Sequence, residues 1–533
     1  MITRDGGISR GIANEKGWVN LEPSAGEELI GEPVSDAATP ILSLIHISDL
    51  HICDAQSPAR VELMDRFADP HHPMSEHIPL VGAYRAQEML TAQTLETMIQ
   101  TVNTIRTGLF SDRPIDAVVA TGDVTDNAQA NELDWYLTLM DGGEVHPDSG
   151  DTSKWEGVAQ KDPAKYDRNY WNPEGTPEGC EEDYPRALYG LPTVPGLTDA
   201  VRQPFIATGL SHTWFATHGN HDALVQGTVP PDATLQFIAT GGARLTDMGE
   251  NFDLSEAFAG WGMVGPAKLA SPSAGVYRET TADPRRRLNA ADDWAKLHLT
   301  CEHNGHGLTE INALEGTKYW SKDLGVVRLI SLDTVNIHGG WQGSLDQTQF
   351  DWLKDVLADP TPKYFILLSH HPLHGLFNDY APEGADRRIA IAELTEELLK
   401  HERIIAWLAG HDHDNRVKYI GEEGKSGFWQ IMTSSLIDWP QQGRLVEILE
   451  DQGRVVIATS LIDHQSPIDL AEATSNLESP VHLAGLSRIL SANHWQRRKA
   501  NDFHVELSAG EASDRNSFLW IDKTPKEDME VLW

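Results

Sequence analysis

Five short apolar runs in this chain end directly in a side chain that can bind a metal ion. The runs are rich in β-branched and aliphatic residues, a composition typical of strands buried on both faces of a sheet. Parallel strands end at one edge of a sheet, and ligands of α/β proteins bind beyond that edge, so the pattern predicts a site there. In chain order the runs are 41–48, 115–122, 213–219, 363–369 and 403–410, followed by Asp49, Asp123, Asn220, His370 and His411.

Helical patterns lie between these runs and predict an α/β fold. From Tyr84 to Leu109 the apolar residues keep a spacing of three to four, which indicates a helix with one buried stripe. Ser344 and Gln347 resemble a capping box that opens a second helix. Residues 444–462 resemble a β-hairpin that turns near Asp451 to Gly453. Strands that alternate with helices favour a mixed sheet covered by helices.

Three stretches rich in Gly, Pro, Asp and aromatic residues interrupt this alternation. We interpret them as ordered insertions within one catalytic domain, because they show little periodicity of their own. Aromatic residues, among them Trp155, Tyr170, Trp171 and Trp261, favour a packed cap over the site rather than disorder. The predicted division is an N-terminal extension (1–40), a catalytic domain (41–470) with insertions at 54–83, 141–212 and 223–320, and a C-terminal helical tail (471–533).

Composition narrows the class of protein. The 533 residues include 42 Lys plus Arg and 80 Asp plus Glu, a formal net charge of −38, which disfavours binding in a nucleic-acid groove. Three cysteines cannot form a disulfide framework, and no apolar run is long enough for a membrane span. The first twenty residues lack an export signal, so the chain as written is expected to be cytoplasmic, or exported if a leader was removed.

Five motifs that are weak alone become specific in combination. They are D-x-H (49–51), GD (122–123), GNHD (219–222), HHP (370–372) and GHDH (410–413). Carboxylate and imidazole ligands suit Mn²⁺, Fe and Zn²⁺, and one Asp can bridge two cations. Glycines before Asp123, Asn220 and His411 allow sharp turns that bring such side chains together. The sequence therefore predicts a metal centre.

This motif set resembles the calcineurin-like metallophosphoesterase superfamily. NHDALVQG, DPRRRL, LDTVN and LSRILSANHW further resemble a bacterial subfamily whose members often carry a twin-arginine leader, which this chain lacks. The resemblance implies a two-sheet αββα sandwich flanked by helices, with long loop insertions that form a cap. It also implies two metal ions, one held by Asp49, His51 and His413, the other by Asn220, His370 and His411, with Asp123 bridging.

The resemblance also implies a reaction. Hydroxide activated by two metal ions (Mn, Fe or Zn) would attack a phosphate monoester or diester, while His221, oriented by Asp222, assists the leaving group. The expected substrate is a small phosphoester, and the oligomeric state stays open. Two alternatives remain: a protein phosphatase, and a non-catalytic binding protein on the same fold.

Several further polar residues follow the motifs closely. Each could contact the substrate or could equally be a turn residue that satisfies backbone groups. The loop 301–307 offers Cys301, His303 and His306, but a zinc site is set aside because no fourth ligand is nearby in sequence, and His306 is expected on the rim. The candidate substrate contacts are Asn127, His306, His371, His374, Asp414 and Asn415, with His371 supporting the neighbouring ligand.

Overall fold

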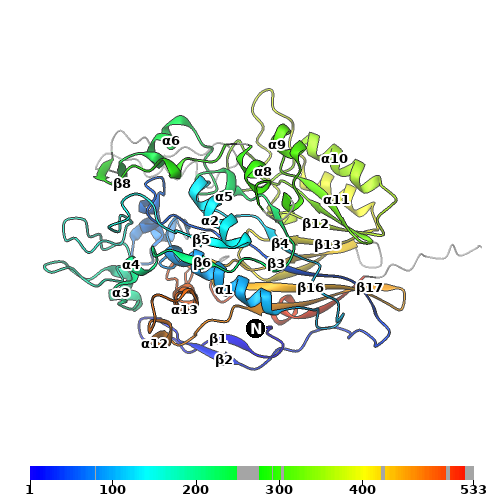
Figure 1. Ribbon diagram of the computed structural model, residues 1–533, viewed down its shortest axis with the longest axis horizontal. Helices are drawn as coiled ribbons and strands as arrows, with labels where there is room; N and C mark the ends of the chain where they lie inside the picture. The colour runs from blue at the N-terminus through cyan, green and yellow to red at the C-terminus, as the bar shows by residue number, and fades with distance from the viewer. Residues whose placement is uncertain are drawn as a thin grey trace, which may run out of the picture.

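Two six-stranded sheets form the centre of the protein (Figure 1). The computed structural model describes residues 1–78, 80–248, 275–290, 292–301, 305–421, 427–499 and 504–521. The first sheet has the order β18-β17-β16-β3-β4-β7 and comprises β3 (Thr39–Ile47), β4 (Ala117–Thr121), β7 (Trp214–Thr217), β16 (Gln442–Asp451), β17 (Arg454–Asp463) and β18 (Ser517–Ile521). The second has the order β10-β11-β12-β13-β15-β14 and comprises β10 (Trp320–Leu324), β11 (Val327–Ser331), β12 (Tyr364–Leu368), β13 (Ile404–Ala409), β14 (Arg416–Gly421) and β15 (Gly427–Met432).

The strands that precede the metal-binding motifs are parallel within each sheet. β3 pairs with β4 and β4 with β7, while β12 pairs with β13. Each of the five apolar runs is therefore a strand, as predicted, and its carboxyl end points to the same edge of its sheet as those of its parallel neighbours. The predicted hairpin is also confirmed: β16 and β17 pair from Asp451↔Arg454 to Gln442↔Asp463.

Side-chain alternation along the strands builds the layers. Ile366 and Leu368 of β12 belong to the core between the sheets, whereas Phe365 and Leu367 pack with the helices outside. This period of two is what a strand buried on both faces requires. α10 (Gln347–Ala358) and α11 (Ile391–Leu399) cover the second sheet, and α1 (Thr91–Thr104) lies against the first, with α13 (Pro480–Ala492) beside α1 (Figure 1). The predicted helix-flanked two-sheet fold is confirmed.

Two helix predictions need correction. The helix expected from Tyr84 to Leu109 spans only Thr91–Thr104, after a short 3₁₀ turn at Glu88–Leu90. The capping box at Ser344 is wrong, because the side chain of Asp346 caps α10 by accepting from the Gln349 amide at 2.8 Å. The Asp346 carboxylate satisfies an amide of the first turn, as N-cap residues do.

The described parts of the insertions carry short elements. Residues 141–212 contain β5 (Gly143–Val145), α3 (Tyr184–Tyr189), α4 (Leu197–Ala200) and β6 (Phe205–Ala207). Residues 223–320 contain α6 (Ala233–Thr240), β8 (Ala243–Asp247), β9 (Val276–Glu279), α8 (Asp293–His298), η6 (Gly305–Gly307) and α9 (Glu310–Glu315). The remaining elements are β1 (Gly7–Arg10), β2 (Leu21–Ser24), α2 (Ala130–Asp141), α5 (Asn220–Ala223), η7 (Leu373–Gly375), α12 (Leu470–Ala473) and α14 (Ala512–Arg515).

Aromatic residues of the 141–212 insertion are packed rather than loose. Tyr170 and Trp171 are buried in a second core together with Tyr84 and Trp495. These side chains therefore attach the insertion to the region of α13. Trp261 lies outside the described residues. The division into extension, catalytic domain and tail stays a prediction, as does the cap.

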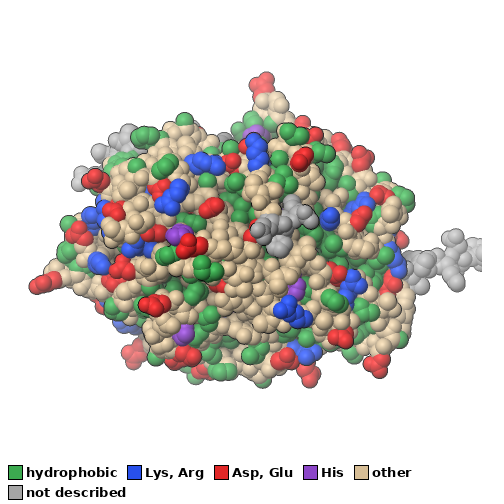
Figure 2. Space-filling model, viewed as in Figure 1, with side chains coloured by type: hydrophobic (Ala, Val, Ile, Leu, Met, Phe, Trp, Pro, Cys, Tyr) green, Lys and Arg blue, Asp and Glu red, His purple; other side chains and the backbone are tan. Residues whose placement is uncertain are grey.

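Two further observations concern the distribution of charge and the hydropathy of the helices. Acidic side chains are spread over the visible face among fewer Lys and Arg, in line with the net charge of −38 (Figure 2). Within the part of the chain that the structure describes, no helix is both long and apolar enough to cross a membrane.

Candidate metal centre

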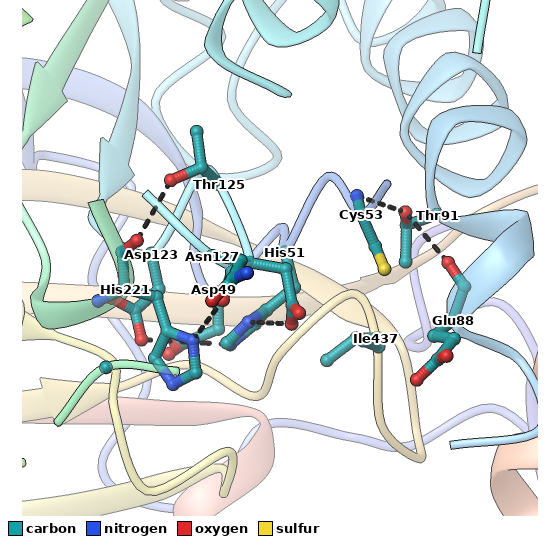
Figure 3. Close-up of polar contacts among 12 residues, drawn as sticks. Asp49, His51, Cys53, Glu88, Thr91, Asp123, Thr125, Asn127, His221 and Ile437 are labelled. Atoms are coloured by element: carbon teal, nitrogen blue, oxygen red, sulfur yellow. Dashed lines mark hydrogen bonds and ion pairs between the residues drawn. The ribbon is translucent and has the colours of Figure 1, made fainter. Parts of the chain in front are cut away.

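The metal-binding motifs meet at the carboxyl ends of β3, β4, β7, β12 and β13. Asp49 and His370 are fully buried, whereas His411 and His221 are half-buried and mark the side open to solvent. In Figure 3, Asp49, His51, Asp123 and His221 lie together, and Cys53, Thr91 and Glu88 form a separate group to the right of them. The sequence motifs thus lie close together, as predicted from their positions after the strands.

The backbone at these strand ends is strained. Five of the seven predicted ligands have φ between 46° and 73°: Asp49, His51, Asp123, His411 and His413. Residues other than glycine rarely adopt this left-handed region, and such strain is concentrated at functional sites. Glycines supply the close approach: a Cβ on Gly410 would lie 2.2 Å from Asp49 Oδ2, and one on Gly219 would lie 2.3 Å from Asp123 Oδ1.

A first pair of imidazoles faces one point. His51 Nε2 lies 3.2 Å from His413 Nε2. On the far side of each ring, His51 Nδ1 lies 3.0 Å from Asp126 Oδ1 and His413 Nδ1 lies 2.8 Å from Asp438 Oδ2. Since each Nδ1–H donates to a carboxylate, each Nε2 presents a lone pair, the usual arrangement of metal-binding histidines. Asp49 Oδ1 lies 3.4 Å from His413 Nε2 and completes a three-residue set.

A second pair stands beside the first. His370 Nε2 lies 3.2 Å from His411 Nδ1, and His370 Nδ1 donates to the Thr121 carbonyl at 2.9 Å. Asp123 Oδ2 lies 3.1 Å from His370 Nε2 and 3.7 Å from His51 Nε2. A single carboxylate oxygen therefore lies between the two imidazole pairs, which is the position that a bridging ligand must occupy.

Asn220 supplies an independent test of whether cations fit. Its Nδ2 donates to the Gly227 carbonyl at 3.0 Å, while its Oδ1 is buried and has no hydrogen-bond partner within the described parts of the chain. Buried amide oxygens are almost always satisfied, so this atom needs a ligand. A cation would supply one, and the mixed oxygen and nitrogen donor set suits Mn²⁺, Fe or Zn²⁺.

The electrostatics of the predicted ligands also favour bound cations. Burial opposes protonation, but the Asp123 carboxylate raises the pKa of His370 to about 9. Burial also opposes protonation of His413, but the Asp49 carboxylate outweighs this effect and raises the pKa of His413 to about 9. The carboxylates thus attract positive charge to these rings, and a metal ion competes with the proton for the same lone pair.

His221 is held beside the bridging carboxylate. Its backbone amide donates to Asp123 Oδ1 at 2.8 Å, and its Nδ1 donates to the Asp126 carbonyl at 2.6 Å. The remaining ring nitrogen, Nε2, is left for other chemistry. Burial lowers the pKa of His221 to about 4, with Asp123 acting in the opposite direction.

Asp222 has a different role from the one predicted. Its Oδ1 accepts from the Thr125 amide at 2.9 Å, and its Oδ2 accepts from the Gly219 amide at 2.8 Å. The carboxylate therefore joins two loops of the site, and the His221 ring is oriented by the Asp126 carbonyl instead. Sequence spacing could not distinguish an adjacent carboxylate from a carbonyl that arrives from another strand.

Two predicted substrate contacts are turned away from the metal-binding residues. Asn415 donates to Gln442 Oε1 at 2.9 Å and accepts from the buried Arg444, so it belongs to the packing behind the site. His306 is buried and stacks on Trp214, the first residue of β7, whereas the predicted ligand Asn220 lies beyond the last residue of that strand. The rim position predicted for His306 is therefore wrong.

Three other predicted substrate contacts, His371, His374 and Asp414, already have partners within the protein. His371 is satisfied at both ring nitrogens, by the Thr334 hydroxyl at 2.8 Å and the Trp341 carbonyl at 2.9 Å. His374 contacts Asp412 at 2.9 Å and is exposed, and Asp414 accepts from Arg416 at 3.0 Å.

Asn127 retains an unused donor. Its Oδ1 accepts from the Gln226 amide at 2.9 Å, while its Nδ2 is buried and none of the residues that the structure describes accepts from it. A buried donor next to the metal-binding loops suits a phosphate oxygen, so the contact predicted for Asn127 stays a prediction that this geometry favours.

Sequence reasoning missed the carboxylates that hold the imidazoles. Asp126 forms an ion pair with Arg60, and Asp438 accepts from Arg85 Nε at 3.0 Å. The only signal for Asp126 was its place in GDVTDN, three residues after Asp123. Asp438 reaches His413 from a separate loop, so no local pattern could have indicated it.

Comparison with known proteins gives one family match and several similar proteins. Residues 195–415 match the calcineurin-like phosphoesterase family model. A manganese-dependent ADP-ribose/CDP-alcohol diphosphatase from Xenopus laevis is 24% identical over 139 residues, covering 24% of this chain and 36% of that protein. A probable cyclic nucleotide phosphodiesterase from Rhodococcus erythropolis is 33% identical over 96 residues, covering 17% and 29%. A dimetal phosphatase from Danio rerio aligns with 80% of this chain and 100% of its own at 13% identity, with a TM-score of 0.36.

Part of the chain is thus similar to the calcineurin-like phosphoesterase family, in line with the resemblance of the sequence motifs. The matched range contains Asn220, His370, His411 and His413, and the structure adds Asp49, His51 and Asp123 from the preceding strands. The alignments span only 36% and 29% of the lengths of these two curated relatives.

Proposed function

We propose that this protein is a metal-dependent phosphoesterase that hydrolyses a small phosphate monoester or diester. The observation that carries the proposal is Asp123 Oδ2, which lies near His370 Nε2 at 3.1 Å and near His51 Nε2 at 3.7 Å. Two imidazole pairs with a shared carboxylate are suited to hold two cations close together. Manganese, iron and zinc all suit the ligand types.

The roles of the protein groups follow from their positions. Two bound cations would supply an activated water and stabilise charge on the phosphoryl oxygens. His221 holds its Nδ1 proton on the Asp126 carbonyl, so Nε2 is the nitrogen that faces substrate. A phosphate anion there favours the charged imidazolium, which can donate a proton to the leaving oxygen. Asn127 Nδ2 is a further donor for a phosphate oxygen.

Aromatic residues beside the centre support an organic substrate. The Trp341 ring lies nearly parallel to that of His411 with centroids 5.8 Å apart, and Phe377 stands edge-on to Trp341 at 5.9 Å. Phe377 is 45% exposed, so a flat group of a ligand could pack on it. The two curated relatives are named for nucleotide-type substrates, which favours a small phosphoester or diphosphate that carries a ring.

The two alternatives have less support. A non-catalytic binding protein would not need His221, yet His221 is present and held beside Asp123. A protein phosphatase would need room for a polypeptide, and the insertions argue against this. Cytoplasmic location and the lack of nucleic-acid binding stay predictions.

The test uses the full chain after chelation and reloading with Mn²⁺, Fe²⁺ or Zn²⁺. Aryl monoesters, aryl diesters and nucleoside diphosphate derivatives are assayed in parallel, with Asp123→Asn as the control for contaminating hydrolases. Hydrolysis that depends on metal and on Asp123 supports the proposal. A protein that binds two ions per chain at this centre yet hydrolyses none of these compounds would be a binding protein, and the proposal would fail.

A further inference from the structure

We propose that Asp141, Cys301 and His306 form a separate binding site for one transition-metal ion of the Zn²⁺ class. One ligand atom from each of these three residues lies within 4.8 Å of the others. Thiolate, imidazole and carboxylate are the three ligand types that zinc binds in proteins. The inference concerns residues outside the dinuclear centre and does not depend on the proposed activity.

Three elements far apart in the chain bring these residues together. Asp141 is the last residue of α2, Cys301 follows α8, and His306 lies in η6. η6 packs on β7 near Trp214, the first residue of that strand, whereas Asn220 lies beyond its last residue. The strand therefore separates this cluster from the predicted dinuclear centre.

The histidines of this region are oriented as metal ligands. His306 Nδ1 faces the Trp214 carbonyl at 3.4 Å, which directs its Nε2 elsewhere. His298 Nδ1 donates to the Trp294 carbonyl at 2.7 Å. For His298, the carbonyl acceptor on Nδ1 leaves the lone pair of Nε2 for a metal.

His298 offers a fourth ligand. It is fully buried, and its Nε2 has no hydrogen-bond partner among the described residues. Its ring centroid lies 5.9 Å from that of His306, so His298 stands next to the three-residue cluster and outside it. A rotation of its side chain would complete a tetrahedral set, and without that rotation water would take the fourth position.

Local charge also favours a cation. The carboxylate of Asp141 lies at the carboxyl end of α2, where the helix dipole disfavours negative charge and favours positive charge. A bound metal ion would compensate the charge of the Asp141 carboxylate and of the Cys301 thiolate, because coordination deprotonates a thiol directly.

Such an ion would fasten the 223–320 insertion to the sandwich. Cys301 and His306 belong to the insertion, while Asp141 belongs to a helix that packs on the first sheet. The contact would be a cross-link of three segments close to β7, the strand that leads to Asn220 and His221. Its expected role is structural.

Cobalt provides a direct test, because a cobalt–thiolate bond absorbs in the near ultraviolet and the dinuclear centre contains no thiolate. We expect the Co²⁺-loaded full chain to show this absorption and Cys301→Ser to lose it. Cys180→Ser and Cys53→Ser, the matched controls, should retain it. Asp123→Asn should also retain it, which separates this site from the dinuclear centre.

Metal analysis after Zn²⁺ loading gives the second readout. Wild type should bind one more ion per chain than Cys301→Ser and than Asp141→Asn, with unchanged circular dichroism as the check on folding. Absence of the absorption from Co²⁺-loaded wild type would overturn the proposal even if both variants misfold. Equal metal content in wild type and folded variants would overturn it as well.

Discussion

His51 Nε2 and His413 Nε2 lie 3.2 Å apart although 362 residues separate them in the chain. Each ring donates its other nitrogen proton to a buried carboxylate, Asp126 for His51 and Asp438 for His413. Two lone pairs at this distance would repel unless they share a positive charge. The relationship therefore supports the position proposed for the first cation.

The bridging position of Asp123 leads to the first prediction. Asp123→Asn removes the negative charge between the two imidazole pairs, so both ions should be lost together. Elemental analysis after gel filtration in dilute chelator measures the metal content. Asp69→Asn, a buried carboxyl outside the centre, should keep both ions, and an Asp123→Asn variant with two tightly bound ions would exclude the bridge.

His221 should affect rate and not metal content. His221→Ala removes the imidazole that is held on the Asp126 carbonyl, while the seven predicted ligands remain. We expect the rate to fall by roughly 10²–10⁴, the range for a positioned acid or base. The loss should shrink for substrates with good leaving groups, and an equal loss across a leaving-group series would contradict the acid role.

Asp438 should act through His413. Asp438→Asn keeps the shape but loses the charge that fixes the Nδ1 proton of His413, so affinity for the first ion should fall by about 10–100-fold. Competition with a chelator of known affinity measures this change. Because Arg85 and Arg497 also pair with Asp438, thermal unfolding of the variant must be followed in parallel. Unchanged affinity for both ions would show that the contact does not support the ligand.

A pH dependence of stability should come from Asp69. Burial raises its pKa from 3.8 to about 7, against the opposing hydrogen bonds from Gln496 and Trp495. A raised folded-state pKa means that the folded chain holds the proton more tightly than the unfolded chain. The contribution of Asp69 is therefore complete below pH 3.8 and is lost as the pH rises toward 7.

Comparison with Asp69→Asn isolates this contribution. Between pH 5 and pH 7 the free energy of unfolding of wild type should fall relative to the variant by roughly 2–3 kcal/mol, at about 1.4 kcal/mol per pKa unit. Urea unfolding of the metal-loaded proteins at several pH values provides the measurement. Parallel stability curves for the two proteins would show that Asp69 keeps an ordinary pKa.

Much of the fold followed from local pattern. The runs that end at Asp49, Asp123, Asn220, His370 and His411 are strands because apolar, β-branched stretches of that length bury both faces. Their shared edge follows from parallel pairing. Boundaries were less predictable: the helix expected from Tyr84 begins at Thr91, because a 3₁₀ turn satisfies the preceding backbone groups.

The sequence by itself determined which residue types stand at the strand ends, and hence which class of chemistry to expect and which superfamily the motifs resemble. Only the tertiary structure decided how those side chains are held. Asp126 and Asp438 orient His51 and His413, Asp222 joins two loops, and His306 lies in the core beside Trp214. Hydrogen-bond partners of this kind come from distant segments, and their direction depends on backbone geometry that no local pattern encodes.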